Sequence, residues 1–212
     1  MNEKTIANNL KKPVGPEGIQ IGDFMAKGNL SFYNNILSLV DFKSTYKVME
    51  IGMGNGKHIH NLFKNGLQEY IGLDYSETMV NEATKNTATL NYVKFIEADA
   101  HNIPVLKNTI DVIFTINTLY FYENPNQVLQ QIKNTLKNGG TFILGKRTFE
   151  DLQNLSAITQ YGFNNYTEEE VKEMLVRNGF KITNHITFAE PESHANNQEF
   201  KLHNEFYVCK SI

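Results

Sequence analysis

The chain has 212 residues, of which 41% are hydrophobic and 20% are charged, an ordinary composition for a soluble globular protein. This length allows one α/β domain with a full core. The net charge of −3 and the pI near 6.1 give no sign of a nucleic-acid-binding domain, which is usually clearly basic. The single cysteine, Cys209, excludes an intramolecular disulfide and a thiolate metal cluster. Its apolar neighbours favour a small buried hydrophobic residue over a nucleophile.

There is no apolar signal core at the N-terminus, and no stretch approaches the length needed to span a membrane. We also find no internal repeat, low-complexity tract or interdomain linker. We therefore expect a single-domain cytoplasmic protein without a membrane partner.

The first 45 residues differ in pattern from the rest of the chain. Pro13, Gly15, Pro16 and Gly18 predict that no helix passes through this part. A stretch from about residue 24 to 42 then carries apolar side chains at helical spacing, which predicts one helix. A helix packed on the edge of a sheet explains this pattern without any function.

From residue 46 onward, short apolar runs alternate with helical patterns, which is typical of a mostly parallel sheet covered by helices on both faces. The predicted strands span residues 46–51, 70–74, 92–97, 110–116, 140–146, 181–189 and 204–210. Capping residues mark the helix boundaries, with starts at Ser76, Asn124-Pro125 and the capping box Thr167–Glu170, and ends at Gly139 and Gly179. The last two strands are predicted to form a hairpin.

The most specific motif follows the first strand. An apolar run ends in Glu50, and three glycines stand after it at alternate positions, Gly52, Gly54 and Gly56. A second apolar run ends in Asp74, whose carboxylate offers an acceptor pair to a ribose diol. In an open α/β sheet, ligands bind outside the carboxyl ends of the strands, so this pattern predicts a nucleoside-cofactor site. A dinucleotide site has glycines spaced G-x-G-x-x-G, whereas Lys57 occupies the third glycine position here.

With these residues the chain resembles the class I S-adenosylmethionine-dependent methyltransferases, over roughly residues 45 to 150. The resemblance implies that the glycine turn passes beneath the methionine part of the cofactor, that Asp74 binds the ribose hydroxyls, and that Asp99 lies near the adenine. It also implies a Rossmann-like, seven-stranded, mostly parallel sheet with an antiparallel last strand and helices on both faces. Residues 1–45 would form a helical lid over the cofactor, and residues 46–212 the methyltransferase domain.

The expected binding set for S-adenosyl-L-methionine combines these positions with their neighbours: Tyr33, Glu50, Gly52, Gly54, Asn55, Gly56, Asp74, Tyr75, Asp99, Ala100 and Asn117. Tyr33 is the residue of the N-terminal segment expected to reach the cofactor. A structural alternative exists for each position. The glycines could merely form a tight turn, and Asp74 and Asp99 could cap the helices that follow them. The joint occurrence at successive strand tips favours the cofactor site.

The acceptor is expected above the fourth and fifth strands. Tyr120 and Tyr122 follow the fourth strand, and Lys146 and Arg147 follow the fifth. Aromatic rings beside two cations would suit an acceptor with a ring or alkyl body and an anionic group, since arginine binds carboxylate or phosphate with a planar fork. The alternative is that the cations are surface charges and the tyrosines fill the edge of the core. The motif Asn/Asp-Pro-Pro-Tyr/Phe of amino-methylating nucleic-acid enzymes is not matched, because Asn117 is followed by Thr-Leu-Tyr.

The histidines give no metal signal. His58, His60 and His101 lack metal-ligand spacing supported by further ligands, so solvated or core-edge roles are favoured and no metal is expected. Transfer from a sulfonium does not require a catalytic side chain, and the sequence assigns none. We therefore expect an S-adenosylmethionine-dependent methyltransferase with a small-molecule acceptor and no nucleic-acid partner. The alternatives are a protein or nucleic-acid methyltransferase and a non-catalytic S-adenosylmethionine-binding protein; the oligomeric state stays open.

Overall fold

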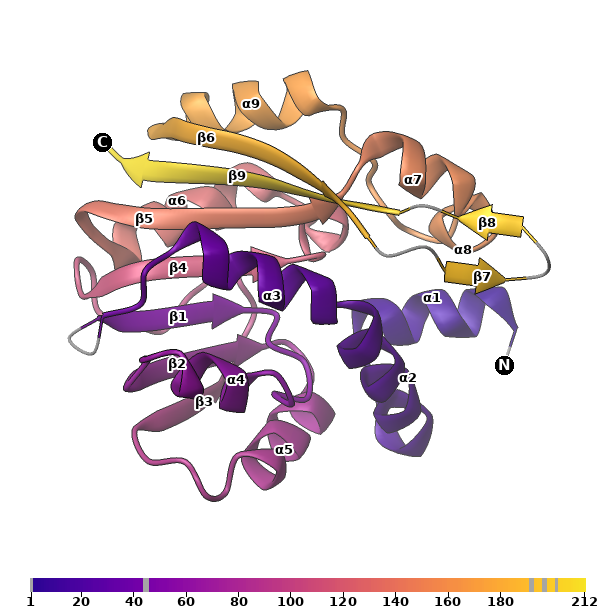
Figure 1. Ribbon diagram of the computed structural model, residues 1–212, viewed down its shortest axis with the longest axis horizontal. Coiled ribbons are helices and arrows are strands. Elements are labelled where there is room, and N and C mark those ends of the chain that lie inside the picture. Colours follow the sequence, from indigo (N-terminus) through magenta and orange to yellow (C-terminus); the bar gives the residue numbers. More distant parts are fainter. Residues whose placement is uncertain (1, 44–45, 191–192, 196–197, 201) are drawn as a thin grey trace.

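The computed structural model describes residues 2–43, 46–190, 193–195, 198–200 and 202–212. Its seven-stranded sheet has the order β3-β2-β1-β4-β5-β9-β6 (Figure 1). The strands are β1 (Lys47–Ile51), β2 (Glu69–Asp74), β3 (Val93–Glu97), β4 (Ile110–Ile116), β5 (Leu136–Arg147), β6 (Phe180–Ala189) and β9 (His203–Ser211). The short strands β7 (Ser193–Ala195) and β8 (Gln198–Phe200) form a separate two-stranded sheet.

The pairing pattern confirms the predicted fold class. Strands β3, β2, β1, β4 and β5 are parallel neighbours. The last strand, β9, pairs antiparallel with both β5 and β6, as the predicted hairpin requires. The carboxyl ends of the five parallel neighbours therefore meet at one edge of the sheet, which we call the carboxyl edge.

Helices cover both faces of the sheet. Neighbouring strand residues point to opposite faces, so each strand contributes side chains to two cores. Val48 and Val112 belong to a core with helices α3 (Leu30–Leu39) and α4 (Ile59–Lys64). Met49 and Ile113, one residue further along each strand, belong to a core with α6 (Pro125–Thr135) and α9 (Glu168–Arg177) on the other face. Helix α5 (Glu77–Asn86) contacts β2 and β3.

Most predicted helix boundaries are confirmed. Ser76 and Asn124 cap α5 and α6 through their side chains, and the capping box at the start of α9 is present. The predicted end of α6 at Gly139 is wrong, because the helix stops at Thr135 and β5 begins at once. Gly139 instead adopts a left-handed φ of 72° within that strand.

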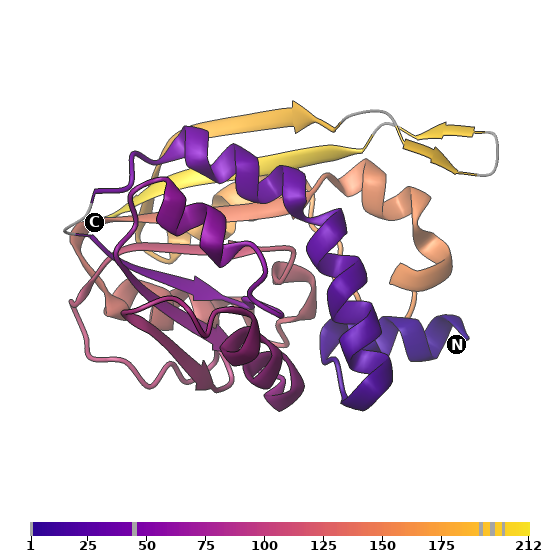
Figure 2. The same ribbon diagram turned by 60° about the horizontal axis from the view of Figure 1, so that its bottom comes forward.

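The prediction for the first 45 residues is wrong in its detail. Two helices, α1 (Glu3–Lys11) and α2 (Gly15–Gly28), precede α3. Pro16 lies in the first turn of α2, where its missing N–H costs no hydrogen bond. The helix predicted over residues 24 to 42 is divided at Asn29, which ends α2 and precedes α3. Figure 2 shows α1 and α2 beyond the ends of the strands, whereas α3 runs along one face of the sheet.

Candidate functional site

The glycine turn joins the tip of β1 to α4. Gly52, Gly54 and Gly56 have left-handed φ values of 76°, 59° and 69°, a conformation that favours glycine. A Cβ on Gly52 would lie 2.3 Å from Thr118 Cγ2, and one on Gly56 would lie 3.0 Å from Ala83 Cβ. A Cβ on Gly54 would meet nothing within 4 Å. Packing alone therefore explains two of the glycines, while Gly54 faces open space that a ligand can approach.

Asp74 connects this turn to the tip of β2. Its Oδ2 accepts a hydrogen bond of 2.8 Å from the Gly54 N–H, and its Oδ1 accepts one of 2.9 Å from the Ser76 N–H. The cap of the following helix is Ser76, so the helix-cap alternative does not describe Asp74. Burial raises the pKa of Asp74 to about 6 against the opposing effect of these two bonds. The carboxylate has about four lone-pair sites, and the backbone N–H groups of Gly54, Ser76 and Tyr75 do not occupy all of them, so it can still accept from a ligand.

Glu50 is placed differently, because its carboxylate is fully buried and held by side chains. Tyr33 donates to Oε1 at 3.1 Å, and Tyr70 donates to Oε2 at 2.5 Å. His58 Nε2 lies 2.6 Å from the same Oε2, and the His58 ring stacks on the Tyr33 ring with centroids 3.6 Å apart. Burial, followed by the Glu50 charge, raises the pKa of both tyrosines well above the usual value. The structure thus places the Tyr33 hydroxyl on Glu50, and direct contact of Tyr33 with the cofactor stays a prediction.

His58 is a functional candidate that sequence reasoning missed. The sequence favours a solvated or core-edge role for it, but it lies within a buried cluster formed with Tyr33, Glu50 and Tyr70. Its position two residues after Gly56 was the one available signal, since that spacing places the ring beside the end of β1.

Asp99 and His101 form a pair at the tip of β3. Asp99 Oδ1 accepts hydrogen bonds from the His101 backbone N–H at 2.9 Å and from the His101 ring nitrogen Nδ1 at 2.6 Å. The Asn124 N–H points at Nε2, which must be the acceptor nitrogen, so Nδ1 carries the proton. Partial burial raises the pKa of Asp99, but the His101 bonds outweigh it and the pKa lies below the usual value. Asp99 keeps a half-exposed side chain.

The remaining expected cofactor residues lie around these groups. Ala100 is buried, and Tyr75 is half exposed with the Lys12 ammonium 3.9 Å from its ring centroid. The Asn55 amide donates to Asp23 of α2 at 2.8 Å. The structure therefore gathers the tips of β1, β2 and β3 with α2 at one edge.

Asn117 links three elements at the tip of β4. Its Oδ1 accepts from the Tyr120 hydroxyl at 2.6 Å and from the Arg147 N–H at 3.2 Å, and its Nδ2 donates to Asn29 at 2.9 Å. The amide is thus bonded to protein groups on both sides. The Tyr122 hydroxyl lies 2.7 Å from Thr118 Oγ1, and burial raises the pKa of both Tyr120 and Tyr122. Both tyrosines are buried, as the core-edge alternative expects, and their contact with an acceptor stays a prediction.

Lys146 and Arg147 match neither sequence interpretation, since they are neither free cations in a pocket nor surface charges. Lys146 is 1% exposed, and its ammonium lies 2.6 Å from Glu205 Oε2. Arg147 pairs with Glu190 at 2.9 Å and donates to the Gly28 carbonyl at 3.3 Å. The reason is strand register, because β5 and β9 place Lys146 directly opposite Glu205. Because both cations are paired, neither side chain is free to bind an anionic acceptor.

One group of side chains has metal-ligand geometry that sequence spacing did not indicate. Glu168, His185 and Glu205 offer three ligand atoms within 4.8 Å of one another. However, Lys146 pairs with Glu205 and Lys172 pairs with Glu168. These ammonium groups balance both carboxylates, so an ion-pair network describes this cluster.

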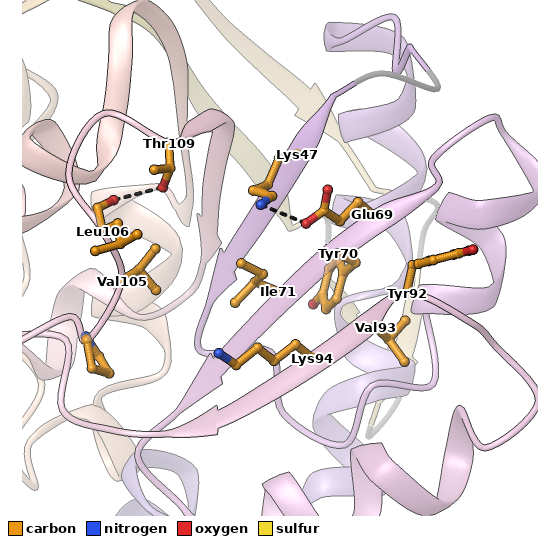
Figure 3. Close-up of a pocket in the computed structure, with 11 residues that line it drawn as sticks. Lys47, Glu69, Tyr70, Ile71, Tyr92, Val93, Lys94, Val105, Leu106 and Thr109 are labelled. Atoms are coloured by element: carbon orange, nitrogen blue, oxygen red, sulfur yellow. Dashed lines mark hydrogen bonds and ion pairs between the residues drawn. The ribbon is translucent and has the colours of Figure 1, made fainter.

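Two cavities lie in the described part of the chain away from the glycine turn. The first, of about 380 Å³, opens at the opposite, amino ends of the strands. Figure 3 shows it between Ile71 of the sheet and the loop that carries Val105 and Leu106, with the Lys47–Glu69 ion pair at its rim. The second, of about 450 Å³, is lined by residues of α7 (Phe149–Asn154), α8 (Ser156–Thr159) and the loop after them. Only the second follows a carboxyl end, that of β5.

Within the described residues, no helix combines the length and the apolar character needed to cross a membrane.

The sheet order and the glycine turn define the class I S-adenosylmethionine-dependent methyltransferase fold. A family model described as a methyltransferase domain matches residues 42–205, and the chain belongs to that family. The cofactor of this class is S-adenosylmethionine. The open side of Gly54 and the remaining lone pairs of Asp74 fit such a nucleoside cofactor.

Comparisons with known proteins agree on the fold and differ in chemistry. A tRNA U34 carboxymethyltransferase from Pseudoalteromonas atlantica is 29% identical over 109 residues, which is 50% of this chain and 33% of that protein. A geranyl diphosphate methyltransferase solved with GPP and sinefungin has a TM-score of 0.70 at 10% identity, covering 86% of this chain and 78% of the other. The [4+2]-cyclase SpnF has a TM-score of 0.66 at 13% identity, covering 85% and 80%. The matches span about a third of the length of the tRNA U34 carboxymethyltransferases and 63% of an uncharacterized protein, MJ1123, from Methanocaldococcus jannaschii, which is 32% identical over 142 residues.

Proposed function

We propose that this protein transfers the methyl group of S-adenosylmethionine to an uncharged small molecule, with the cofactor held by the glycine turn and the tips of β2 and β3. The observation that carries this proposal is the Gly54–Asp74 junction. There, a left-handed glycine with an open side donates its N–H to a carboxylate that keeps unused lone pairs. When bound, S-adenosylmethionine supplies a methyl group already activated by its sulfonium.

The residues of the carboxyl edge divide into direct and indirect roles under this proposal. Asp74 binds the ribose hydroxyls, and Asp99, held by His101, faces the adenine. Gly54 lets the ligand approach the backbone. The groups bonded to protein partners, Glu50 and Asn117, shape the turn and the tip of β4 without touching the ligand.

We further propose that residues 1–45 act as a lid, with residues 46–212 as the methyltransferase domain. Support comes from contacts of the N-terminal segment with the turn and with α5. Asp23 accepts from Asn55 and pairs with Lys57 at 2.6 Å. The carbonyl of Pro13 accepts from the Ser76 hydroxyl at 2.5 Å. These contacts support the lid role, because a segment held against the turn and α5 would exclude water from a bound cofactor.

The charged residues at the tip of β5, where the acceptor is expected to bind, favour an uncharged small molecule as the acceptor. Lys146 and Arg147 are paired with Glu205 and Glu190, so these side chains offer no anion site. The α7–α8 cavity of about 450 Å³ is lined by two apolar residues, three amides and a threonine, which are Phe149, Leu152, Gln153, Gln160, Asn165 and Thr159. This hollow is shallow and open to solvent, and it is our candidate for the acceptor site because it follows the carboxyl end of β5.

A second candidate is group transfer to tRNA, and its support is that several curated relatives are named tRNA U34 carboxymethyltransferases. Against it stand the net charge of −3 and the paired cations, since nucleic-acid binding depends on free basic groups.

Two measurements test the proposal. Isothermal titration should detect binding of S-adenosylhomocysteine and not of NADH. Labelled S-adenosylmethionine should then be offered to a pool of uncharged metabolites and, separately, to a tRNA pool from the same cells. Label in the small-molecule pool is the expected result. Label only in tRNA would establish the second candidate, and cofactor binding with no transfer to any acceptor would contradict methyltransferase activity.

A further inference from the structure

The buried cluster around Glu50 spans the glycine turn from one end to the other. Glu50 stands two residues before Gly52, and His58 stands two residues after Gly56. The bond of 2.6 Å between His58 Nε2 and Glu50 Oε2 therefore ties together the two ends of the turn that carries Gly54. Both side chains are buried, at 5% and 0% exposure, so water does not compete for this bond.

The hydrogen-bond directions in the cluster follow from its donors. The hydroxyls of Tyr33 and Tyr70 both donate to the Glu50 carboxylate. With Glu50 as the acceptor, the His58 bond requires the proton on Nε2. A buried carboxylate with three donors is satisfied, and the loss of one donor is costly because a buried charge then lacks a partner.

Tyr33 brings the N-terminal segment into this cluster. It lies on α3, donates to Glu50, and stacks on the His58 ring with an interplanar angle of 4°. The same segment contacts the turn a second time, where Asp23 of α2 accepts from Asn55. The segment thus touches the turn at its two ends through Tyr33 and at its middle through Asp23.

We propose that His58 and Tyr33 are positioning residues that couple the order of the N-terminal helices to cofactor binding at the glycine turn. His58 holds the turn in the conformation that leaves Gly54 open, and Tyr33 transmits that conformation to α3. The coupling rests on the proposed cofactor site. It is reciprocal, because a segment that stabilises the binding-competent turn is itself stabilised when the ligand binds.

Hydrogen exchange with and without S-adenosylhomocysteine tests the coupling directly. In the wild-type chain, saturating ligand should slow exchange in the peptide of residues 30–39 by about fivefold or more, the lower end of usual coupling energies. Tyr33→Phe keeps the ring and its stacking but removes the hydroxyl, so it should reduce this ligand-induced protection. It should also weaken ligand affinity about tenfold, because the lost bond is to the Glu50 carboxylate.

His58 is tested by two variants, one that keeps a donor and one that does not. His58→Ala should weaken S-adenosylhomocysteine binding at least tenfold, the fold-change of a lost hydrogen bond to a charged group. His58→Gln retains an amide donor and should recover part of that loss. Tyr46→Phe is the matched control for the tyrosine, since Tyr46 packs against the same core but is not part of the cluster.

The outcomes separate this inference from the proposed function. If wild-type protein binds no S-adenosylhomocysteine, the cofactor site itself is wrong and the coupling falls with it. If the ligand binds but protects residues 30–39 equally in wild type and Tyr33→Phe, only the coupling is overturned. A folded His58→Ala variant with unchanged affinity would likewise overturn it, whereas a purely structural role would lower the melting temperature and leave ligand-induced protection intact.

Discussion

The two halves of the carboxyl edge treat their charged residues in opposite ways. In the half made by β1 and β2, Asp74 is held by backbone N–H groups within twenty residues of it along the chain. In the half made by β5 and β9, Lys146 is held by Glu205, which lies far along the chain. Backbone bonds leave the carboxylate with free lone pairs, whereas the buried ion pair neutralises the cation. The first arrangement is suited to a ligand and the second to stabilising the fold.

The largest expected effect is a loss of stability in the half made by β5 and β9, where Glu205 neutralises Lys146. Lys146→Met removes the ammonium and leaves Glu205 as a buried carboxylate without its cation. Breaking a buried pair in this way costs about 3–5 kcal/mol, so the free energy of unfolding in urea should fall by that amount. The exposed Lys94 of β3 supplies the control, since Lys94→Met should change stability by less than about 0.5 kcal/mol. Equal losses of unfolding free energy in Lys146→Met and Lys94→Met would show that the buried ion pair does not stabilise this half of the carboxyl edge.

The second effect is a pH dependence of stability that arises from Asp74, in the half made by β1 and β2. The pKa of Asp74 is raised from 3.8 to about 6, so the folded protein binds more protons than the unfolded chain between these values. The stability contributed by protonated Asp74 is complete below pH 3.8 and is lost as the pH rises through about 6. At 1.36 kcal/mol per pKa unit the loss is at most about 3 kcal/mol.

The pH effect is isolated by subtraction. Urea unfolding of wild type and Asp74→Asn should be measured from pH 4 to 7, because Asp99 and Glu205 have lowered pKa values and contribute with the opposite sign. The difference between the two proteins should fall as the pH rises. A difference that stays constant over this range would mean that Asp74 is ionised throughout.

The third effect tests whether the free lone pairs of Asp74 serve a ligand. Asp74→Ala should weaken S-adenosylhomocysteine binding by roughly 1.5–3 kcal/mol, the range for hydrogen bonds to a charged group. Titration calorimetry on the variant and the wild type gives this value. Asp111 pairs with Lys137 at the start of β4, at the opposite end of the sheet, so Asp111→Ala is a suitable control and should leave affinity unchanged. Full affinity in Asp74→Ala would exclude Asp74 from the binding site.

The sequence predicted the fold and the glycine turn because both depend on local signals. Glycine spacing, capping residues and apolar runs act within about ten residues, and the structure confirms the caps of α5 and α9. The antiparallel last strand of the sheet was implied by the family resemblance, and the structure confirms it as well. The prediction at Pro16 was wrong because the effect of a proline depends on its position in a helix. A proline breaks the interior of a helix but suits its first turn, and the sequence alone did not show where the helix began.

The roles of the charged residues could not be predicted, because they depend on strand register. Lys146 faces Glu205 only because β9 returns antiparallel beside β5. The Tyr33–Glu50 bond requires α3 to pack on the sheet at one particular position along its axis. Both contacts join residues that no local pattern connects, which is why the prediction placed Lys146 and Tyr33 in open sites.

The smallest expected effect concerns Tyr122, which lies between the two halves of the carboxyl edge. Its hydroxyl bonds Thr118 beside the glycine turn, while its loop leads toward the α7–α8 cavity, since Asn164 donates to the Tyr122 carbonyl at 3.3 Å. Tyr122→Phe removes the neutral hydrogen bonds of its hydroxyl with Thr118 and Thr115, of which the second is long, and should lower the free energy of unfolding by about 0.5–1.5 kcal/mol. If the hydroxyl serves only the fold, cofactor affinity and kcat/KM for an identified acceptor should stay within twofold of wild type. A loss of kcat/KM greater than tenfold at unchanged cofactor affinity would instead assign Tyr122 to the acceptor site. In that case the acceptor half would begin at the tip of β4, one strand closer to the glycine turn than the paired cations of β5.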